Sequence, residues 1–220
     1  GDENGRENKP AAGGGDIAGG AHREEARREN LKGTCMDRDA ALKLLADHIE
    51  QDNLMKHCLA TEAVMRHLAR RLGFDEHAWG LAGLLHDLDY HATKDDMARH
   101  GLRTAEILAG LGVSPDIIAA IKAHNAENLG LTRQAPIDFA LSAGETITGL
   151  IVAVALVYPD KRLKSVKPSS VAKRMKEAHF ARTVNREHIM LCERLGLSLP
   201  EFIEVSLAAM AAIDRELGLA

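Results

Sequence analysis

The chain has 220 residues and a formal net charge of −4, a length that suits one or two domains. The acidic balance argues against a protein whose whole surface binds nucleic acid, and an aromatic content of 3% disfavours a base-stacking platform. Its three cysteines form no CxxC pair, which excludes a disulfide scaffold and a cysteine-only zinc site and suits a reducing cytoplasm. We therefore expect a cytoplasmic protein with a substantial hydrophobic core.

Residues 1–35 differ in composition from the rest of the chain. They are rich in glycine and charge, and Ile17 and Leu31 are their large apolar side chains. Such a segment cannot bury enough apolar surface to offset the entropy that is lost on ordering. We predict a disordered leader over residues 1–35 and one domain over residues 36–220, while the mixed charges of residues 23–32 leave a short docking helix open.

From Asp37 onward the apolar residues recur at helical spacing almost throughout, and no alternating strand pattern with hairpin turns appears. Segments 39–51 and 53–72 are the first two predicted helices. Asp75 is placed to cap the next helix, which runs toward Leu85. The first half of the domain is therefore expected to be helical.

Capping signals mark two further helix starts. Ser114 with Pro115 at the first helical position begins one helix, and Ser198 with Glu201 three residues later forms a capping box that begins another. Together these patterns predict an all-α fold, a single bundle of about eight helices.

The stretch 139–159 carries a single charge, Glu145, and is long enough to cross a membrane. Serine, threonine and glycine residues dilute its apolar character, and no polybasic segment immediately precedes it. We predict that it is the buried central helix of a soluble bundle, and we expect no membrane association.

The pair His86–Asp87 ends the uncharged run 80–85, so both side chains are expected to be buried. Burying polar groups without partners costs several kcal/mol, on the order of a lost hydrogen bond or more. A hydrogen-bonded pair would satisfy them. A neutral imidazole and a carboxylate are equally a normal start to a ligand set for Zn, Fe or Mn.

Three further histidines favour the metal interpretation. His57 lies on the apolar face of its predicted helix, His100 is expected to head a helix, and His124 follows Ile117 and Ile121 at helical spacing. Four inward-facing histidines in a small helical domain are difficult to satisfy by hydrogen bonds alone. The pattern therefore predicts a metal site.

Glu145 adds a carboxylate to this set. An ionised carboxylate within an uncharged helix must be paired, neutralised or bound to a metal. The alternatives to metal binding are a glutamate whose pKa is raised by burial and one that reaches water.

The order of His57, the pair His86–Asp87 and a later carboxylate resembles the HD superfamily of metal-dependent phosphohydrolases. The stretch 148–154, together with the regions around Ser165 and Phe180, is typical of a small bacterial subgroup of HD hydrolases. The resemblance extends over the chain from about Asp37 to Ile213 and implies a single HD-type helical bundle.

The resemblance also implies a ligand set. In the family the first histidine, the His–Asp pair and a final aspartate hold one metal, and Glu145 stands here at the place of that aspartate. Either a small backbone shift accommodates the extra methylene group of Glu145, or the glutamate weakens metal binding or changes which metal is bound. Two added histidines mark the dinuclear members, and His100 and His124 fit that role, with Asp87 bridging two metals. The implied metal ligands are His57, His86, Asp87, His100, His124 and Glu145.

The chemistry that follows is hydrolysis with divalent cations, two ions of Fe, Mn or Zn, which would clamp a phosphate and activate a water. We assign Asp87 and Asp89 as catalytic residues, and Asp89 could orient a ligand histidine. Substrate phosphate contacts are assigned to Lys94, Lys164 and Lys167. The basic run 161–176 is either a solvated face or an electrostatic funnel for the substrate.

We therefore expect a phosphohydrolase that acts on a small phosphorylated compound, with nucleotides as one candidate class, and that binds neither nucleic acid nor membrane. The oligomeric state is left open. Two alternatives remain. One is a di-iron HD-fold oxygenase, and the other is a degenerate HD domain that binds a nucleotide without catalysis.

Overall fold

A computed structural model describes residues 36–220, and the predicted leader over residues 1–35 lies outside the described residues. The described part contains helices and no strand, so the predicted all-α class is confirmed. In chain order the α-helices are α2 (Arg38–His48), α3 (Asp52–Leu72), α4 (Glu76–Leu85), α5 (Tyr90–Thr93), α6 (Leu102–Gly110), α7 (Pro115–His124), α8 (Ala126–Leu129), α9 (Pro136–Leu156), α10 (Pro168–Met175), α11 (Arg186–Met190), α12 (Leu199–Ala211) and α13 (Asp214–Leu217).

Two short 3₁₀ helices complete the described part, η2 (Leu163–Ser165) and η3 (Leu191–Leu195). Within residues 36–220, eight α-helices have eight or more residues, which matches the predicted number. The other four α-helices have four or five residues, too few for a hydrophobic period to reveal them in the sequence.

The capping signals place the helix ends correctly. The Asp75 carboxylate accepts hydrogen bonds from the first backbone N–H groups of α4, and Ser114 does the same for α7. Ser198 and Glu201 form the predicted capping box of α12. The helix predicted over 39–51 ends earlier, because Ile49 already has an extended backbone.

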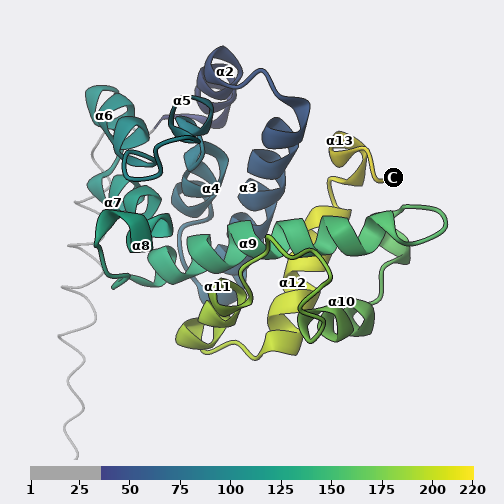
Figure 1. The fold of residues 1–220 in the computed structure, drawn as a ribbon. Helices are drawn as coiled ribbons and strands as arrows, with labels where there is room; N and C mark the ends of the chain where they lie inside the picture. Colours follow the sequence, from purple (N-terminus) through teal and green to yellow (C-terminus); the bar gives the residue numbers. More distant parts are fainter. Residues whose placement is uncertain (1–35) are drawn as a thin grey trace, which may run out of the picture. The chain divides into compact units, whose positions relative to one another are not determined.

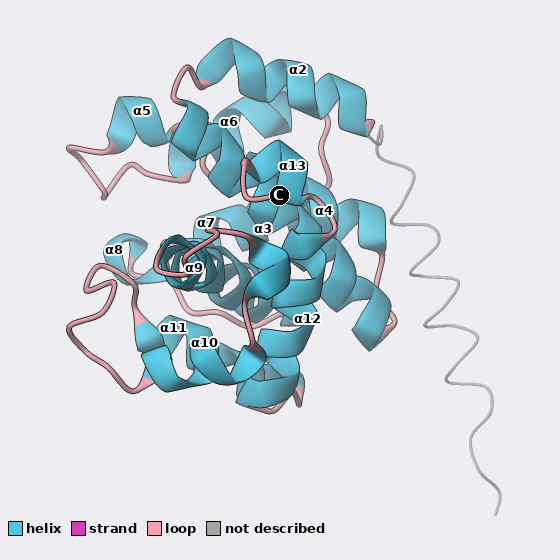
Figure 2. Cartoon of the chain, turned by 90° about the vertical axis from the view of Figure 1, so that its right-hand side faces the viewer, coloured by secondary structure: helices cyan, strands magenta, loops and turns pink. Residues whose placement is uncertain are grey.

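Helix α9 is the central element of the described part. It contacts α3, α4, α7, α11 and α12, and Figure 1 shows it running between α3 and α4 on one side and α11 and α12 on the other. Figure 2 views it nearly end-on, with helices above and below it. Within residues 36–220, α9 is the one helix long and apolar enough to cross a membrane, and 67% of its apolar window is buried. The prediction of a buried core helix is therefore confirmed.

Helices α3 and α4 pack closely enough to require a glycine. A Cβ atom added at Gly83 would lie 2.8 Å from the carbonyl oxygen of Thr61 and 3.0 Å from the Cα atom of Glu62. Both contacts are with backbone atoms, which cannot move without the helix. Gly83 therefore sets the separation between α3, which carries His57, and the end of α4, which precedes His86.

We expect Gly83→Ala to lower the free energy of unfolding by about 2–3 kcal/mol, because the added methyl overpacks this interface. The matched control is Gly110→Ala, also in a helix, where an added Cβ meets nothing within 4 Å. That control should be neutral or stabilising by up to about 1 kcal/mol, since alanine is the better helix former. Urea unfolding of both variants makes the comparison, and equal stabilities would show that α3 and α4 do not need the glycine.

Candidate metal centre

Five segments bring the six predicted ligands together. His57 comes from α3, His86 and Asp87 follow α4, and Glu145 lies in the middle of α9. His124 is the last residue of α7, and His100 precedes α6 in a turn rather than heading the helix as predicted. Two groups could each hold a metal ion, with ligand atoms within 4.8 Å of one another: His57, His86 and Glu145, and Asp87, His100 and His124.

Asp87 lies between the two pairs of histidines. Its Oδ2 atom is 3.4 Å from His86 Nε2 and 3.7 Å from His57 Nε2. Its Oδ1 atom is 3.2 Å from His100 Nε2 and 3.8 Å from His124 Nε2. One carboxylate oxygen thus faces each pair, which is the placement of a carboxylate that bridges two cations.

In the first pair, each histidine has its Nδ1 atom bound to an oxygen. His86 Nδ1 donates to the Gly83 carbonyl at 2.8 Å. His57 Nδ1 lies 3.1 Å from Thr148 Oγ1, whose own hydroxyl donates to the Glu145 carbonyl at 2.7 Å. Since the hydroxyl proton is used there, His57 Nδ1 is the donor. Both rings therefore present an Nε2 lone pair toward the centre.

In the second pair, the acceptors are a carbonyl and a carboxylate. His124 Nδ1 donates to the Ile121 carbonyl, and His100 Nδ1 donates to Asp89 Oδ1 at 2.8 Å. Both acceptors lack a proton, so Nδ1 carries it in each ring. The Nε2 atoms again face the centre, and this arrangement is typical of histidines that bind metals.

The spacing of the Nε2 atoms tests whether this donor set fits a cation. They lie 3.2 Å apart in the His57–His86 pair and 2.9 Å apart in the His100–His124 pair. Metal–imidazole bonds are ~2.0–2.1 Å, so two nitrogens at 90–110° on one ion are roughly 2.9–3.4 Å apart. In the His57–His86 pair both rings are neutral with Nδ1 protonated, so there is no proton to share between their two Nε2 atoms. The donor set fits a metal in both groups.

The protonation states of three histidines agree with this. Burial lowers the pKa of His57, lowers that of His86 to about 3 and lowers that of His124 to about 4, so all three are neutral near pH 7. Burial alone would raise the pKa of Asp87, but the interactions with the His86 and His100 imidazoles outweigh burial and hold that pKa well below its usual range. The bridging position is therefore an anion.

His100 differs from the other histidines because it lies between two carboxylates. Burial opposes its protonation, but the hydrogen bonds to Asp87 and Asp89 outweigh burial and raise its pKa to about 9. The negative charge around His100 therefore attracts positive charge, whether a proton or a cation supplies it.

Glu145 reaches the first group despite departing from the expected aspartate. Its carboxylate lies within 4.8 Å of the His57 and His86 ligand atoms and accepts a hydrogen bond from Thr146 Oγ1 at 2.7 Å. Burial raises its pKa to about 8, and the nearby charge of Asp87 acts in the same direction. His57 and Glu145 are partly exposed, whereas Asp87, His100 and His124 are buried. Solvent therefore reaches the centre on the side of His57 and Glu145.

Asp89 is placed to position His100. Its Oδ1 atom accepts from His100 Nδ1, and its Oδ2 atom accepts from the backbone N–H groups of Gly101 and Thr104, both at 2.9 Å. Its carboxylate is fully buried, and these bonds lie on the side of the imidazole away from Asp87. The geometry supports the predicted orienting role, and Asp89 is a positioning residue that acts through His100.

We expect Asp89→Asn to weaken metal affinity at the Asp87–His100–His124 group by about 10–100-fold, the usual cost of losing a partner to a ligand histidine. The amide removes the charge that holds the His100 ring and its Nδ1 proton. Asp95→Asn, at an exposed position, is the matched control. Metal titration of both variants measures the effect, and equal affinities would remove Asp89 from the site.

Arg133 supports the centre and was not singled out from the sequence as a functional residue. Its guanidinium donates to the His124 carbonyl at 3.0 Å and to Ser142 Oγ at 2.6 Å, and it pairs with Glu127 at 2.6 Å. It therefore joins the end of α7 to α9, which carries Glu145. Its loop position gives no periodic signal in the sequence. Thr148 could have been noticed, since it lies three residues after Glu145 on the same helix.

No hydrogen bond or ion pair within the described residues joins the three predicted phosphate lysines to the centre. Lys164 binds Asp214 Oδ2 of α13 at 2.7 Å, and Lys167 is exposed just before α10. Both follow the end of α9, which at 1.5 Å per residue lies roughly 16 Å along the helix from Glu145. Lys94 is exposed at the end of α5, and no hydrogen bond or ion pair within residues 36–220 joins it to the ligands.

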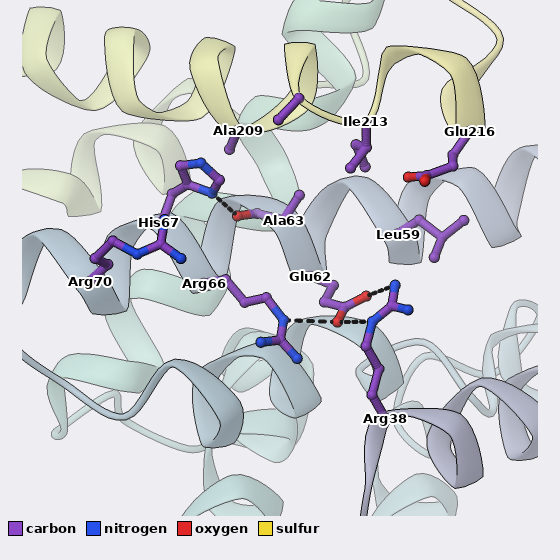
Figure 3. A pocket seen from close by; sticks show the side chains of 11 residues that line it. Arg38, Leu59, Glu62, Ala63, Arg66, His67, Arg70, Ala209, Ile213 and Glu216 are labelled. Atoms are coloured by element: carbon purple, nitrogen blue, oxygen red, sulfur yellow. Dashed lines mark hydrogen bonds and ion pairs between the residues drawn. The ribbon is translucent and has the colours of Figure 1, made fainter.

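A groove of about 150 Å³ lies between α3 and the C-terminal helices and contains none of the six ligands. Figure 3 shows Arg38 and Arg66 converging on the Glu62 carboxylate, at 2.7 and 2.9 Å, beside the apolar side chains of Leu59 and Ile213. Glu62 therefore pairs with both of these arginines. We assign the groove a structural role in joining α2 to α3.

Comparison with known proteins gives two matches. Residues 54–157 match the family model of the HD domain, a segment that includes all six predicted ligands. Ribonuclease Y of Chloroflexus aurantiacus is 32% identical over 97 residues, which cover 44% of this chain and 18% of that protein. The chain thus spans less than a fifth of that relative's length. No solved structure matches the chain.

Proposed function

We propose that the chain hydrolyses a small phosphorylated compound at a dinuclear metal centre, because residues 54–157 match the HD domain and the HD superfamily that the sequence resembles consists of metal-dependent phosphohydrolases. The observation that carries the proposal is the position of Asp87, with one carboxylate oxygen toward each pair of histidines. A site for a single metal ion would leave His100 and His124 without a role, although their Nε2 atoms are spaced as two ligands of one ion.

The residues divide between two cation positions. His57, His86 and Glu145 would hold one ion, His100 and His124 the other, and Asp87 both. Four imidazoles and two carboxylates suit Fe, Mn or Zn. When bound, two such cations would neutralise the charge of a phosphate group and lower the pKa of a water so that it can attack phosphorus.

The chain's own residues prepare this centre. Asp87 stays ionised and supplies the negative charge that both positions share. The bonds of Thr148, Asp89 and the two carbonyl acceptors fix the four imidazole rings before any substrate arrives. The phosphate group would enter beside His57 and Glu145, where the centre meets solvent. The buried second group then stays screened from water.

The test begins with protein stripped by a chelator and reloaded with Mn²⁺, Fe²⁺ or Zn²⁺. We expect phosphate release from mononucleotides, sugar phosphates or a nitrophenyl phosphate only after reloading. Because one relative is named a ribonuclease, cleavage of RNA phosphodiester bonds is tested as well. A reloaded protein that binds two ions but cleaves none of these esters would contradict the proposal.

The same assay separates hydrolysis from oxygenase chemistry. Phosphate release in anaerobic buffer requires no oxygen, so it would exclude the di-iron oxygenase alternative for that substrate. Oxygen uptake with iron-loaded protein, without phosphate release, would favour the alternative instead.

A further inference from the structure

A basic and partly apolar loop joins α9 to α10 and takes no part in the centre. We call residues 156–167 the α9–α10 loop. In Figure 1 it is the green segment at the far end of α9 from α6, α7 and α8. Leu156 and Val157 are 51% and 56% exposed, the highest values among the large hydrophobic residues of the described part. An exposed aliphatic pair at the end of a core helix calls for an explanation.

The loop is held in a fixed conformation. Tyr158 Oη shares a hydrogen bond with Ser170 Oγ at 2.8 Å and accepts one from the Lys167 backbone N–H at 3.2 Å. Leu163 and Val166 are buried and anchor the loop to the core. The exposure of Leu156 and Val157 is therefore built into the fold.

The charges of the loop are mostly basic. Lys161, Arg162 and Lys167 are exposed and form no ion pair among residues 36–220. Lys164 is paired with Asp214. The loop's acid, Asp160, is occupied by Ser165 Oγ and by the backbone N–H of Arg162. Lys173 in α10 and Lys176 directly after it add two exposed lysines. The loop thus presents aliphatic side chains beside unpaired cations.

We propose, in place of the expectation from the sequence that the protein binds no membrane, that the α9–α10 loop docks the protein on a membrane surface that carries anionic phospholipids. Lysine and arginine side chains are attracted to anionic headgroups, while leucine and valine can enter the boundary of the acyl chains. Single-stranded RNA would match the cations but not the aliphatic pair, because bases stack on aromatic rings. A second copy of the loop would bring like charges together. An anionic lipid surface can interact with both the exposed cations and the exposed aliphatic pair.

The test is sedimentation of the full chain with vesicles of phosphatidylcholine alone or with phosphatidylglycerol added. We expect binding to the anionic vesicles, several-fold weaker binding in 0.5 M salt, and little binding to neutral vesicles. Leu156→Ser with Val157→Ser, and separately Lys161→Glu with Arg162→Glu, should each weaken binding about tenfold or more. Both pairs lie on the surface, and circular dichroism verifies that the variants are folded.

The matched control combines Leu111→Ser with Arg103→Glu, one exposed aliphatic and one exposed basic residue at α6, and it should bind as the wild type does. Two outcomes would overturn the proposal. One is anionic-vesicle binding that is absent or unaffected by the loop variants. The other is single-stranded RNA that binds the loop and displaces the vesicles, which would make the loop a nucleic-acid surface.

Discussion

Asp87→Asn is expected to lower phosphohydrolase activity about a thousandfold or more and to remove most of the bound metal. Metal stabilisation of transition-state charge is worth several kcal/mol, and each ~1.4 kcal/mol is a factor of ten in rate. Asparagine has nearly the same shape but lacks the charge, and its NH₂ group would face one pair of Nε2 atoms that Asp87 now faces with an oxygen. Steady-state kinetics and metal analysis of the same preparations measure both losses.

The control for this variant is Asp95→Asn, which makes the same chemical change at an exposed position. It should keep both its metal and its activity. An Asp87→Asn protein that is folded, retains two metal ions and remains within tenfold of wild-type activity would refute the bridging role of Asp87.

His124→Ala is expected to remove one of the two metal ions and to lower activity about a hundredfold. The substitution deletes a ligand from the Asp87–His100–His124 group and leaves His57, His86, Glu145 and the Oδ2 atom of Asp87 in place. The remaining ion can still activate water but lacks the second charge that helps to clamp the phosphate.

Metal analysis by plasma emission, together with initial rates, checks the His124→Ala result. His91→Ala, at an exposed position after Asp87, is the matched control and should keep two ions. A His124→Ala protein that still holds two ions with unchanged affinity would show that His124 is not a ligand.

The sequence indicated the helices that carry strong local signals. Three helices are capped by contacts within a few residues of the chain, from Asp75, Ser114 and Ser198, so their starts can be predicted from the local sequence. The four- and five-residue helices and the start of α6 depend on packing against other segments. His100 was predicted at a helix start, but α6 begins only at Leu102. Gly101, whose φ of 85° is left-handed, separates His100 from the helix.

The convergence of the six candidate ligands was predicted because the histidines were expected on inward helix faces, and because the resemblance to the HD superfamily implied the full ligand set. The residues that hold the ligands in place were harder to find. Thr148 acts through a hydrogen bond between two helices to His57, 91 residues away, and Arg133 acts from a loop on the last carbonyl of α7. The predicted phosphate lysines have no comparable signal in the sequence. A run of basic residues has no hydrophobic periodicity from which the direction of each side chain could be predicted. Lys164, for example, pairs with Asp214.

Metal content of the wild-type protein, purified without chelator and measured beside His86→Ala and Glu145→Ala, tests the dinuclear centre most directly. We expect about two equivalents of Fe, Mn or Zn per chain, and fewer in both variants, because both residues belong to the first group of predicted ligands. One equivalent in the wild type would contradict the bridging role of Asp87. No metal, even after reloading, would contradict the hydrolytic function and leave a domain that binds its ligand without catalysis.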